Sequence, residues 1–237
     1  MTENPSLGRR LAAEGVGSFL LFACVIGSGI MAQNLSGGND AVALLGNTIA
    51  TGAMLFVLIT MLGPISGAHM NPAVSLVAVS RGELRWTDAV GYILVQLALG
   101  ICGAWAAHLM FGLPTLQLSV KARTGLGQWA GEAIATFGLI LTILGTIRHR
   151  PAWVPASVAL YITSAYWFTS STSFANPAIT VARSLTNTFA GIAPHDVPLF
   201  ILAQLIGAFL AAMTVHILFD DWIYPQRPSA KSQKKLA

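Results

Sequence analysis

The sequence predicts an all-α integral membrane protein with six transmembrane helices and two short re-entrant half-helices, arranged as an inverted repeat of three spans plus three. Three observations predict this fold class. Of the 237 residues, 54% are hydrophobic and only 9% are charged, and the mean hydropathy is +0.67. Six long apolar segments alternate with polar loops, and an Asn-Pro-Ala tripeptide occurs twice, each time before a shorter apolar stretch. A soluble domain carries about 25% charged residues, so we expect most of this surface to face lipid.

Six segments are long enough to cross a bilayer, because about 20 apolar residues span its hydrocarbon core. They lie near 11–32, 44–63, 87–110, 129–147, 153–170 and 197–219. The first is longer than the core of a cleaved signal peptide, so we interpret it as a span. Two stretches, 71–80 and 176–188, are too short to cross. We expect them to be half-helices, which membranes tolerate where protein or water covers the broken backbone.

The basic residues predict that both termini are cytoplasmic. With six spans the termini share one side, and that side holds ten Lys and Arg residues against three on the other side, namely Lys121, Arg123 and Arg183. Segment 227–237 is polar and basic and is expected to form a cytoplasmic tail. Because these charges lie between apolar segments, the net charge of +4 does not indicate a nucleic-acid partner.

The two halves of the chain repeat each other in three blocks. Residues 11–22 parallel 129–140, residues 67–75 parallel 173–180, and residues 92–100 parallel 200–207. The whole chain, 1–237, is therefore interpreted as one domain, with repeat one at about 11–110 and repeat two at about 129–219. Each repeat holds an odd number of spans, so the second copy enters the membrane upside down. Such repeats place the functional site at their interface near the midplane.

The paired tripeptides carry the chemistry of that interface. Asn is a strong helix cap and Pro suits the first helical position, so each motif is expected to begin a half-helix. The motif residues are Asn71, Pro72, Ala73, Asn176, Pro177 and Ala178. In an inverted repeat the two helix N-termini meet, and each carries about half a positive charge that repels cations and protons. The Asn amides and the uncoiled backbone before each motif offer donors and acceptors, which suits small, uncharged, hydrogen-bonding solutes.

At this point the chain resembles the major intrinsic protein family of aquaporins and aquaglyceroporins along nearly its whole length. The segments SGAHMNPAVS and TSFANPAIT carry the resemblance, together with a Glu in the first span of each half and a Gln in the third. The resemblance implies six spans plus two half-helices, a pore within each protomer and a homotetramer. It also implies passive transport of water and small neutral solutes with no cofactor. The sequence has no enzyme motif and no metal-ligand spacing.

The selectivity filter departs from the family pattern. In ordinary water channels an Arg follows the second motif, and here that position is Ile179; gap-free counting assigns the other positions to Thr51, Ser164 and Ser173. Replacing Arg with Ile removes a permanent charge and a fork of donors. With no aromatic residue or His opposite, we expect a wider pore. The pattern is similar to that of bacterial members associated with arsenic resistance, which pass arsenous acid or methylated arsenicals.

Four further residues have two interpretations each. Arg183 lies four positions after Ile179, on the same helix face. It is either a vestibule cation or a structural residue that pairs with Asp196 or with loop carbonyls or lies on the surface. The resemblance implies that Glu14 and Glu132 hold loop amides, although a proton relay is the alternative for charges inside spans. His69 is expected in the cytoplasmic half of the pore, as a scaffold or as a pH gate.

Three alternatives to this solute assignment stay open. Within the channel class, the chain is a plain water or glycerol facilitator. An ion-coupled secondary transporter also uses inverted repeats and broken helices, but it needs an ionisable group at the midplane site. The third alternative is a structural membrane protein that conducts nothing.

Overall fold

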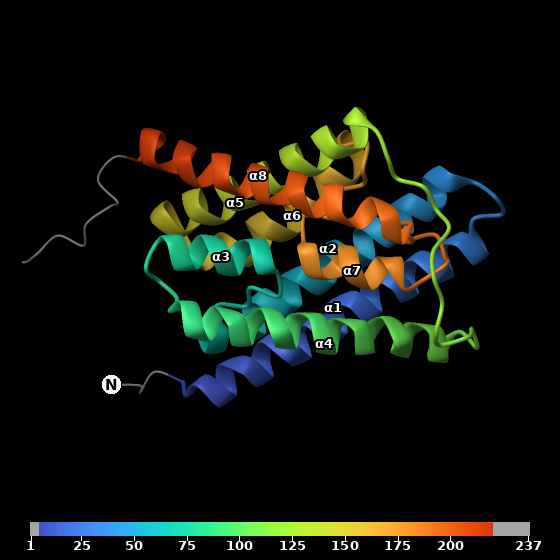
Figure 1. Ribbon diagram of the computed structural model, residues 1–237, viewed down its shortest axis with the longest axis horizontal. Coiled ribbons are helices and arrows are strands. Elements are labelled where there is room, and N and C mark those ends of the chain that lie inside the picture. Colours follow the sequence, from blue (N-terminus) through green and yellow to red (C-terminus); the bar gives the residue numbers. More distant parts are fainter. Residues whose placement is uncertain (1–4, 220–237) are drawn as a thin grey trace, which may run out of the picture.

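The computed structural model describes residues 5–219, and its regular elements in that range are all helical (Figure 1). The first half contains α1 (Leu7–Leu35), α2 (Asp40–Ser66), α3 (Pro72–Ser80) and α4 (Trp86–Met110). The second half contains α5 (Leu126–His149), α6 (Val154–Phe168), α7 (Pro177–Ser184) and α8 (Val197–Leu218), with 3-10 turns at Pro151–Trp153 and Pro194–Asp196. The expected all-helical membrane fold is confirmed, while the basic tail at 227–237 lies outside the described residues.

Within residues 5–219, five helices are long and apolar enough to cross a membrane, judged by length and composition: α1, α2, α4, α5 and α8. The remaining expected span, near 153–170, corresponds to α6, which has only 15 residues and follows a 3-10 turn. At 1.5 Å per residue α6 is about 22 Å long, shorter than a hydrocarbon core of about 30 Å. The short half-helices α3 and α7 occupy the two stretches that were predicted to re-enter.

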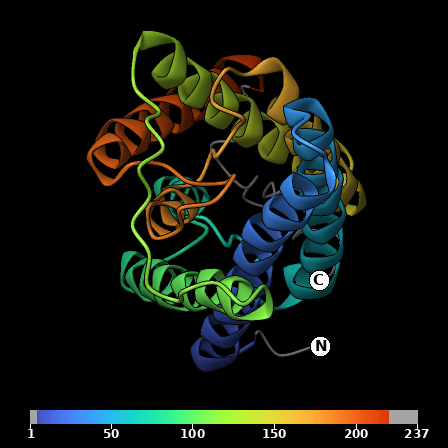
Figure 2. The ribbon, with the colours of Figure 1, turned by 90° about the vertical axis from the view of Figure 1, so that its right-hand side faces the viewer.

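The helices pack as two similar halves. In the first half α1 packs against α2 and α4, and in the second α5 packs against α6 and α8. The halves meet where α2 packs against α6, and each half-helix also packs against the last long helix of the other half, α3 against α8 and α7 against α4. Viewed from the end, α7 lies between α4 and α8 (Figure 2). The half-helices therefore tie the two repeats together.

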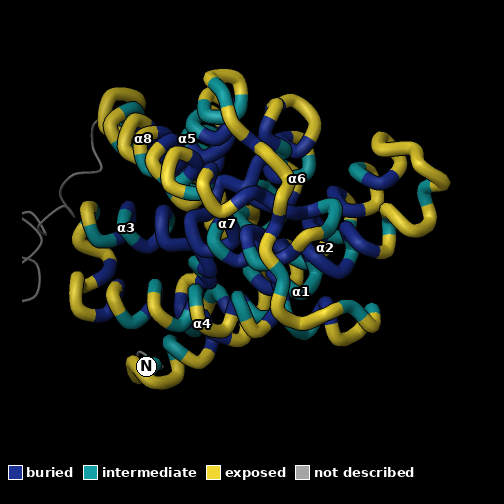
Figure 3. The backbone as a smooth tube through the Cα atoms, turned by 45° about the vertical axis from the view of Figure 1, so that its right-hand side comes forward, coloured by how far each residue is buried: buried dark blue, intermediate teal, exposed yellow. Residues whose placement is uncertain are grey.

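Large apolar side chains cover the outside of the bundle. Figure 3 shows exposed residues along the outward faces of the long helices and buried residues between them. Exposed apolar side chains include Phe56, Leu94, Leu160 and Phe209. In water such a surface would be an aggregation hazard, whereas lipid solvates it. This distribution fits a protein whose long helices are surrounded by hydrocarbon.

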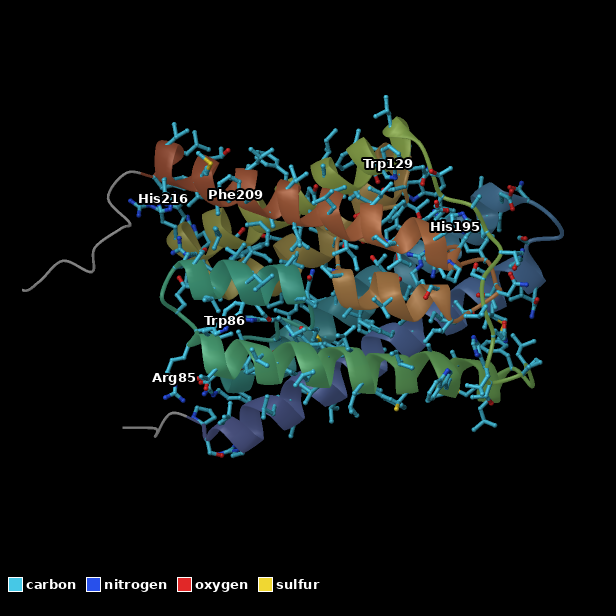
Figure 4. The ribbon with its side chains drawn as sticks, in the orientation of Figure 1. Arg85, Trp86, Trp129, His195, Phe209 and His216 are labelled. Atoms are coloured by element: carbon cyan, nitrogen blue, oxygen red, sulfur yellow. The ribbon has the colours of Figure 1, made fainter. Side chains whose placement is uncertain are left out.

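The first and last described helices share one end of the molecule. The start of α1 and the end of α8 lie at the same end, as an even number of crossings requires (Figure 1). Arg85, Trp86 and His216 lie at this end, whereas Trp129 and His195 lie toward the opposite end (Figure 4). The exposed Trp86 and the half-buried Trp129 are thus separated along the long axis, as aromatic residues at two membrane interfaces are.

Candidate functional site

The two Asn-Pro-Ala motifs meet at the centre of the molecule. The side-chain amide of Asn71 donates to the carbonyl oxygen of Ala175 across 2.8 Å, and that of Asn176 donates to the carbonyl oxygen of Met70 across 2.8 Å. Each Asn also caps its own half-helix, because Asn71 Oδ1 accepts from the amide of Ala73 at 2.9 Å and Asn176 Oδ1 makes the matching bond. Both helix N-termini therefore point toward the same central region, where their dipoles place partial positive charge.

Each motif is preceded by a strained, uncoiled segment. Ala68 and Met70 have φ of 48° and 47°, and Ser173 and Ala175, at the matching positions of the second half, have φ of 50° and 47°. The left-handed region costs a non-glycine residue about 1–2 kcal/mol. Such strain persists where the surroundings over-determine it and is typical of functional sites. The alternating backbone keeps these segments from closing their own hydrogen bonds, which leaves carbonyl groups for other partners.

A buried carboxylate in each half holds the strained segment. Glu14 accepts hydrogen bonds from the amides of His69 at 2.8 Å and Met70 at 2.6 Å, and also from Ser66 and Gln96. Every one of these partners is a donor, as an ionised carboxylate requires.

The second half repeats this arrangement with different residues. Glu132 accepts from the amides of Phe174 at 2.8 Å and Ala175 at 2.9 Å, and from Gln204 at 2.6 Å. With all their oxygens so engaged, Glu14 and Glu132 lie as scaffold groups behind the two central segments.

A cavity of about 280 Å³ passes the two motifs. Its lining extends from Glu83, which follows α3 at the end that carries the start of α1, to Arg183 in the last turn of α7. Asn71 and Asn176 both line it, and each amide nitrogen has a second hydrogen beyond the one given to the protein. A solute oxygen at this point therefore finds two donors from opposite halves of the chain.

The walls of the cavity combine polar and apolar groups. The polar groups come from the strained segments, Gly67–Met70 and Ser173–Ala175, and from the Asn side chains. The apolar groups come from α1, α2, α5 and α6 and include Leu21, Leu55, Ile140, Val158 and Ile162. Such a mixed lining admits solutes that form hydrogen bonds with its polar groups while losing part of their hydration.

Three of the four expected filter residues line this cavity. Thr51, Ser173 and Ile179 do so, and all three are buried. Ser164 does not: it is exposed, and its hydroxyl donates to the carbonyl oxygen of Tyr161 at 2.7 Å. The gap-free count reached the wrong face of α6, because residues two apart on a helix differ by about 200° in direction.

The expectation that no aromatic ring enters this part of the cavity is wrong. Tyr166, two residues after Ser164, lines the cavity, and its phenol donates to Thr51 Oγ1 at 3.3 Å. Phe174 also contributes to the lining, and its ring lies against the guanidinium groups of Arg123 and Arg183. Tyr166 follows Val158 and Ile162 at four-residue spacing, and all three line the cavity. That spacing along α6 was the sequence signal that identifies its inward face.

Arg183 is buried, with 2% exposure, and lines the same cavity as Ile179. Its Nε donates to the carbonyl oxygen of Ala190, and its Cζ lies 3.4 Å from the centre of the Phe174 ring. It forms no ion pair with Asp196, which instead accepts from the backbone amide of Arg123 at 2.7 Å. Of the alternatives raised from the sequence, Arg183 thus combines a loop-carbonyl contact with a place in the cavity wall.

The sequence-predicted His69 also lines the cavity, in the half nearer the start of α1. Its Nδ1 lies 3.1 Å from Ser75 Oγ, and its ring meets Tyr92 edge to face at 5.5 Å. Within residues 5–219, no group of three or more His, Cys, Asp or Glu side chains is arranged to hold a metal ion.

The loop between α4 and α5 adds two cations near the Arg183 end. Burial, the like charge of Arg123 and that of Arg183 lower the pKa of Lys121 to about 8. Burial is also the main reason that the pKa of Arg123 is lowered to about 10. The distribution of basic residues in the sequence predicts that Lys121, Arg123 and Arg183 share one side of the membrane, but no sequence pattern predicts that they lie close together.

Comparison with known proteins identifies relatives along most of the chain. The sequence model of the "Major intrinsic protein" family matches residues 1–173. The aquaglyceroporin AqpS of Rhizobium meliloti is 54% identical over 222 residues, covering 94% of this chain and 93% of the relative. The aquaporin AqpM of Methanothermobacter thermautotrophicus is 31% identical over 250 residues, covering 91% of this chain and 99% of the relative.

A solved structure shares the architecture. The aquaglyceroporin from Plasmodium falciparum superimposes with a TM-score of 0.73 at 17% sequence identity, covering 92% of this chain and 99% of the other. At that identity the likeness concerns the fold alone.

Proposed function

The chain belongs to the major intrinsic protein family, and on that premise we propose that it is a passive channel for small uncharged solutes with an Arg-less filter. Membrane channels of this family are not enzymes. We assign as solutes polyol-like metalloid acids, namely arsenous acid and methylated arsenicals, together with glycerol and water. The single observation that carries the proposal is the cavity that passes both Asn side chains and is lined at the filter position by Ile179.

The chemistry of the lining favours neutral, hydroxyl-bearing solutes. A trihydroxy solute can accept from the amides of Asn71 and Asn176 while donating to carbonyls of the strained segments. The two helix N-termini place partial positive charge at this point, which disfavours cations and protons. Ile179 offers no donor and no charge, so a solute that carries methyl groups meets no unpaired polar group there.

One relative supports a solute larger than water. A protein 54% identical to this chain is named an aquaglyceroporin. We therefore keep glycerol among the proposed solutes. A plain water or glycerol facilitator is the second candidate, favoured by Tyr166, which lines the cavity and donates to Thr51.

We further propose a plasma-membrane location in a bacterial cell, with both termini in the cytoplasm. The ten-to-three distribution of Lys and Arg supports this orientation, as does the common end at which α1 begins and α8 ends. A homotetramer with one pore in each protomer follows from the family resemblance.

Comparative flux into proteoliposomes tests the proposal. We expect glycerol and arsenous acid to enter faster than in empty liposomes, and the Ile179→Arg variant to lower both rates about tenfold, which corresponds to about 1.4 kcal/mol in the barrier. Ile179→Val is the matched control and should retain them. Wild-type protein that passes water alone would overturn the solute assignment, and protein that passes nothing would favour a non-conducting structural role.

The same liposomes separate a channel from an ion-coupled carrier. A channel gives rates that are unchanged when a proton or sodium gradient is imposed, whereas a carrier accumulates solute against its gradient. Because Glu14 and Glu132 are fully engaged as hydrogen-bond acceptors, we expect no coupling.

A further inference from the structure

Two buried arginines share one aromatic ring at the α7 end of the cavity. The Cζ atoms of Arg123 and Arg183 lie 4.9 Å and 3.4 Å from the centre of the Phe174 ring. The arginines come from different elements, since Arg123 lies in the loop between α4 and α5 and Arg183 in the last turn of α7. Their exposed fractions are 9% and 2%. This pair is a concentration of positive charge away from water.

Neither guanidinium group has an acidic partner in the described part of the chain. Arg123 donates to the carbonyl oxygens of Gly191 at 2.9 Å and Ser171 at 3.0 Å, and Arg183 donates to that of Ala190. All three acceptors are neutral. Within residues 5–219, no carboxylate lies within ion-pair distance of either side chain.

The nearby carboxylates are already engaged elsewhere. Asp196 accepts from the backbone amide of Arg123, and Glu132 accepts from the amides of Phe174 and Ala175 and from Gln204. Glu132 acts on the arginines only through space. A buried charge without a close counter-ion is expensive, and buried charges in proteins are normally paired. The pair therefore lacks the anion that such an arrangement ordinarily has.

The donors of Arg183 are available to a ligand. Its two terminal nitrogens make no hydrogen bond with any residue between 5 and 219, and they are not among the polar atoms sealed from solvent. Arg183 lines the cavity, so these nitrogens open onto it. A third cation, Lys121, lies in the same loop as Arg123. Its ammonium group donates to the carbonyl oxygen of Phe189 at 2.9 Å and lies over the ring of that residue, and the charges of both arginines act on it.

We propose that Arg183, supported by Arg123 and Lys121, forms a binding site for one small oxyanion at the outer end of the cavity. The planar guanidinium fork matches two oxygens of a carboxylate or a phosphonate-like group. The site is distinct from the central Asn pair, which receives neutral solutes. This proposal rests on the proposed channel function in one respect, namely that the bound anion would occupy the cavity through which neutral solutes pass.

Direct binding to the purified full-length protein tests the site without any flux. The probe is acetate, and methylphosphonate serves as a second oxyanion. Each is added to the protein at increasing concentration and constant ionic strength, and binding is measured both from the unfolding temperature and by calorimetry. A ligand that binds only the folded state raises the unfolding temperature with concentration. We expect saturable stabilisation in the wild type, and none from an equal concentration of a neutral polyol. Absence of any oxyanion-specific stabilisation overturns the proposal.

Variants separate ligand binding from structural support. Arg183→Gln is expected to weaken acetate binding at least tenfold, and Arg183→Lys, which retains charge but loses the fork, to weaken it less. Lys121→Gln removes an exposed charge without disturbing the buried pair and is expected to weaken binding about threefold. Arg150→Gln is the matched control at the other end and should bind as wild type. Unchanged binding in both Arg183→Gln and Lys121→Gln overturns the proposal.

Parallel glycerol flux keeps the two proposals apart. We expect external acetate to slow glycerol entry in the wild type and not, at the same concentration, in Arg183→Gln. Acetate binding that persists in a protein with no flux refutes the channel assignment alone. Normal glycerol flux in a protein that binds no oxyanion refutes the anion site alone.

Discussion

The phenol of Tyr166 donates to Thr51 Oγ1 at 3.3 Å and so joins α6 to α2 at the wall of the cavity. Both residues are buried, and the exposed fraction of the Tyr166 side chain is only 3%. An aromatic ring thus occupies the filter region from α6, where the sequence had placed a small Ser. The width of this passage depends on that ring as well as on Ile179.

Replacing Tyr166 with Leu should widen the passage. The change removes a ring from the lining, so we expect the rate of glycerol entry, relative to water, to rise by about threefold, or roughly 0.7 kcal/mol in the barrier. Stopped-flow light scattering on proteoliposomes measures both rates. Tyr161→Leu is the matched control on the same helix, because Tyr161 does not line the cavity and its phenol donates to the carbonyl of Ala135. If the ratio of glycerol entry to water entry were the same in Tyr166→Leu and Tyr161→Leu, the proposal that the Tyr166 ring narrows the passage would be contradicted.

Replacing Asn71 or Asn176 with Ala should destabilise the fold as well as the pore. Each change removes a helix cap, worth about 1 kcal/mol, and a hydrogen bond between the halves, worth about another 1 kcal/mol. The free energy of unfolding should therefore fall by roughly 2 kcal/mol, measured by denaturant titration in detergent. Ser80→Ala, which removes only a local bond to Val77 in α3, is the control. A loss no larger than that of the control would show that the cross-link carries little energy.

Adding a methyl group at either of two glycines should weaken close packing between helices and destabilise the fold. A Cβ at Gly103 would overlap the carbonyl oxygen of Phe19, and one at Gly207 would overlap that of Ala133. Small residues allow such close approach of membrane helices, and overpacking costs about 1–3 kcal/mol. Gly103→Ala and Gly207→Ala should lower the unfolding temperature. A Cβ at Gly63 in α2 would meet no atom within 4 Å, so Gly63→Ala should leave it unchanged or higher. An unfolding temperature that falls more in Gly63→Ala than in Gly103→Ala and Gly207→Ala would contradict the role of the two glycines in helix packing.

Oxyanion affinity at the Arg183 end should fall as pH rises from 7 to 9. The lowered pKa of Lys121, about 8, means that this side chain is mostly protonated at the lower pH and mostly neutral at the higher one. The charges acting on it are Arg123 in its own loop, Arg183 in α7 and Asp40 at the start of α2. Calorimetric titration with acetate at several pH values measures the trend, and Lys121→Gln should flatten it. A wild-type profile as flat as that of the variant would remove Lys121 from the site.

Much of the fold was predictable because membranes restrict what a sequence can do. Backbone groups in hydrocarbon must bond internally, so apolar segments of sufficient length were read as helices, and five of the six expected spans meet that length in the structure. The two half-helices were predictable from Asn and Pro at their first positions. The fifth span was harder to delimit, because α6 is short and is preceded by a 3-10 turn.

The details of the candidate site were less predictable. Thr51 and Ser173 reach the cavity, but Ser164 does not, since a count along the chain does not fix the rotation of a helix. Left-handed conformations at Ala68 and Met70 have no local sequence signal, because alanine and methionine rarely adopt them alone. The grouping of Arg123 with Arg183 depends on how a loop crosses the end of the bundle. Contacts between residues so far apart in the chain produce no periodic pattern in the sequence.

The reciprocal bonds of the central turns also bear on how the protein is made. The first turn leaves the ribosome before the carbonyl of Ala175 has been synthesised, so the amide of Asn71 has no native acceptor during that interval. The half-helix α3 likewise has no partner until α8, the last helix within residues 5–219, has been translated. Insertion of the first three spans must therefore yield an unfinished intermediate, and the two central turns can be completed only when the C-terminal helices arrive.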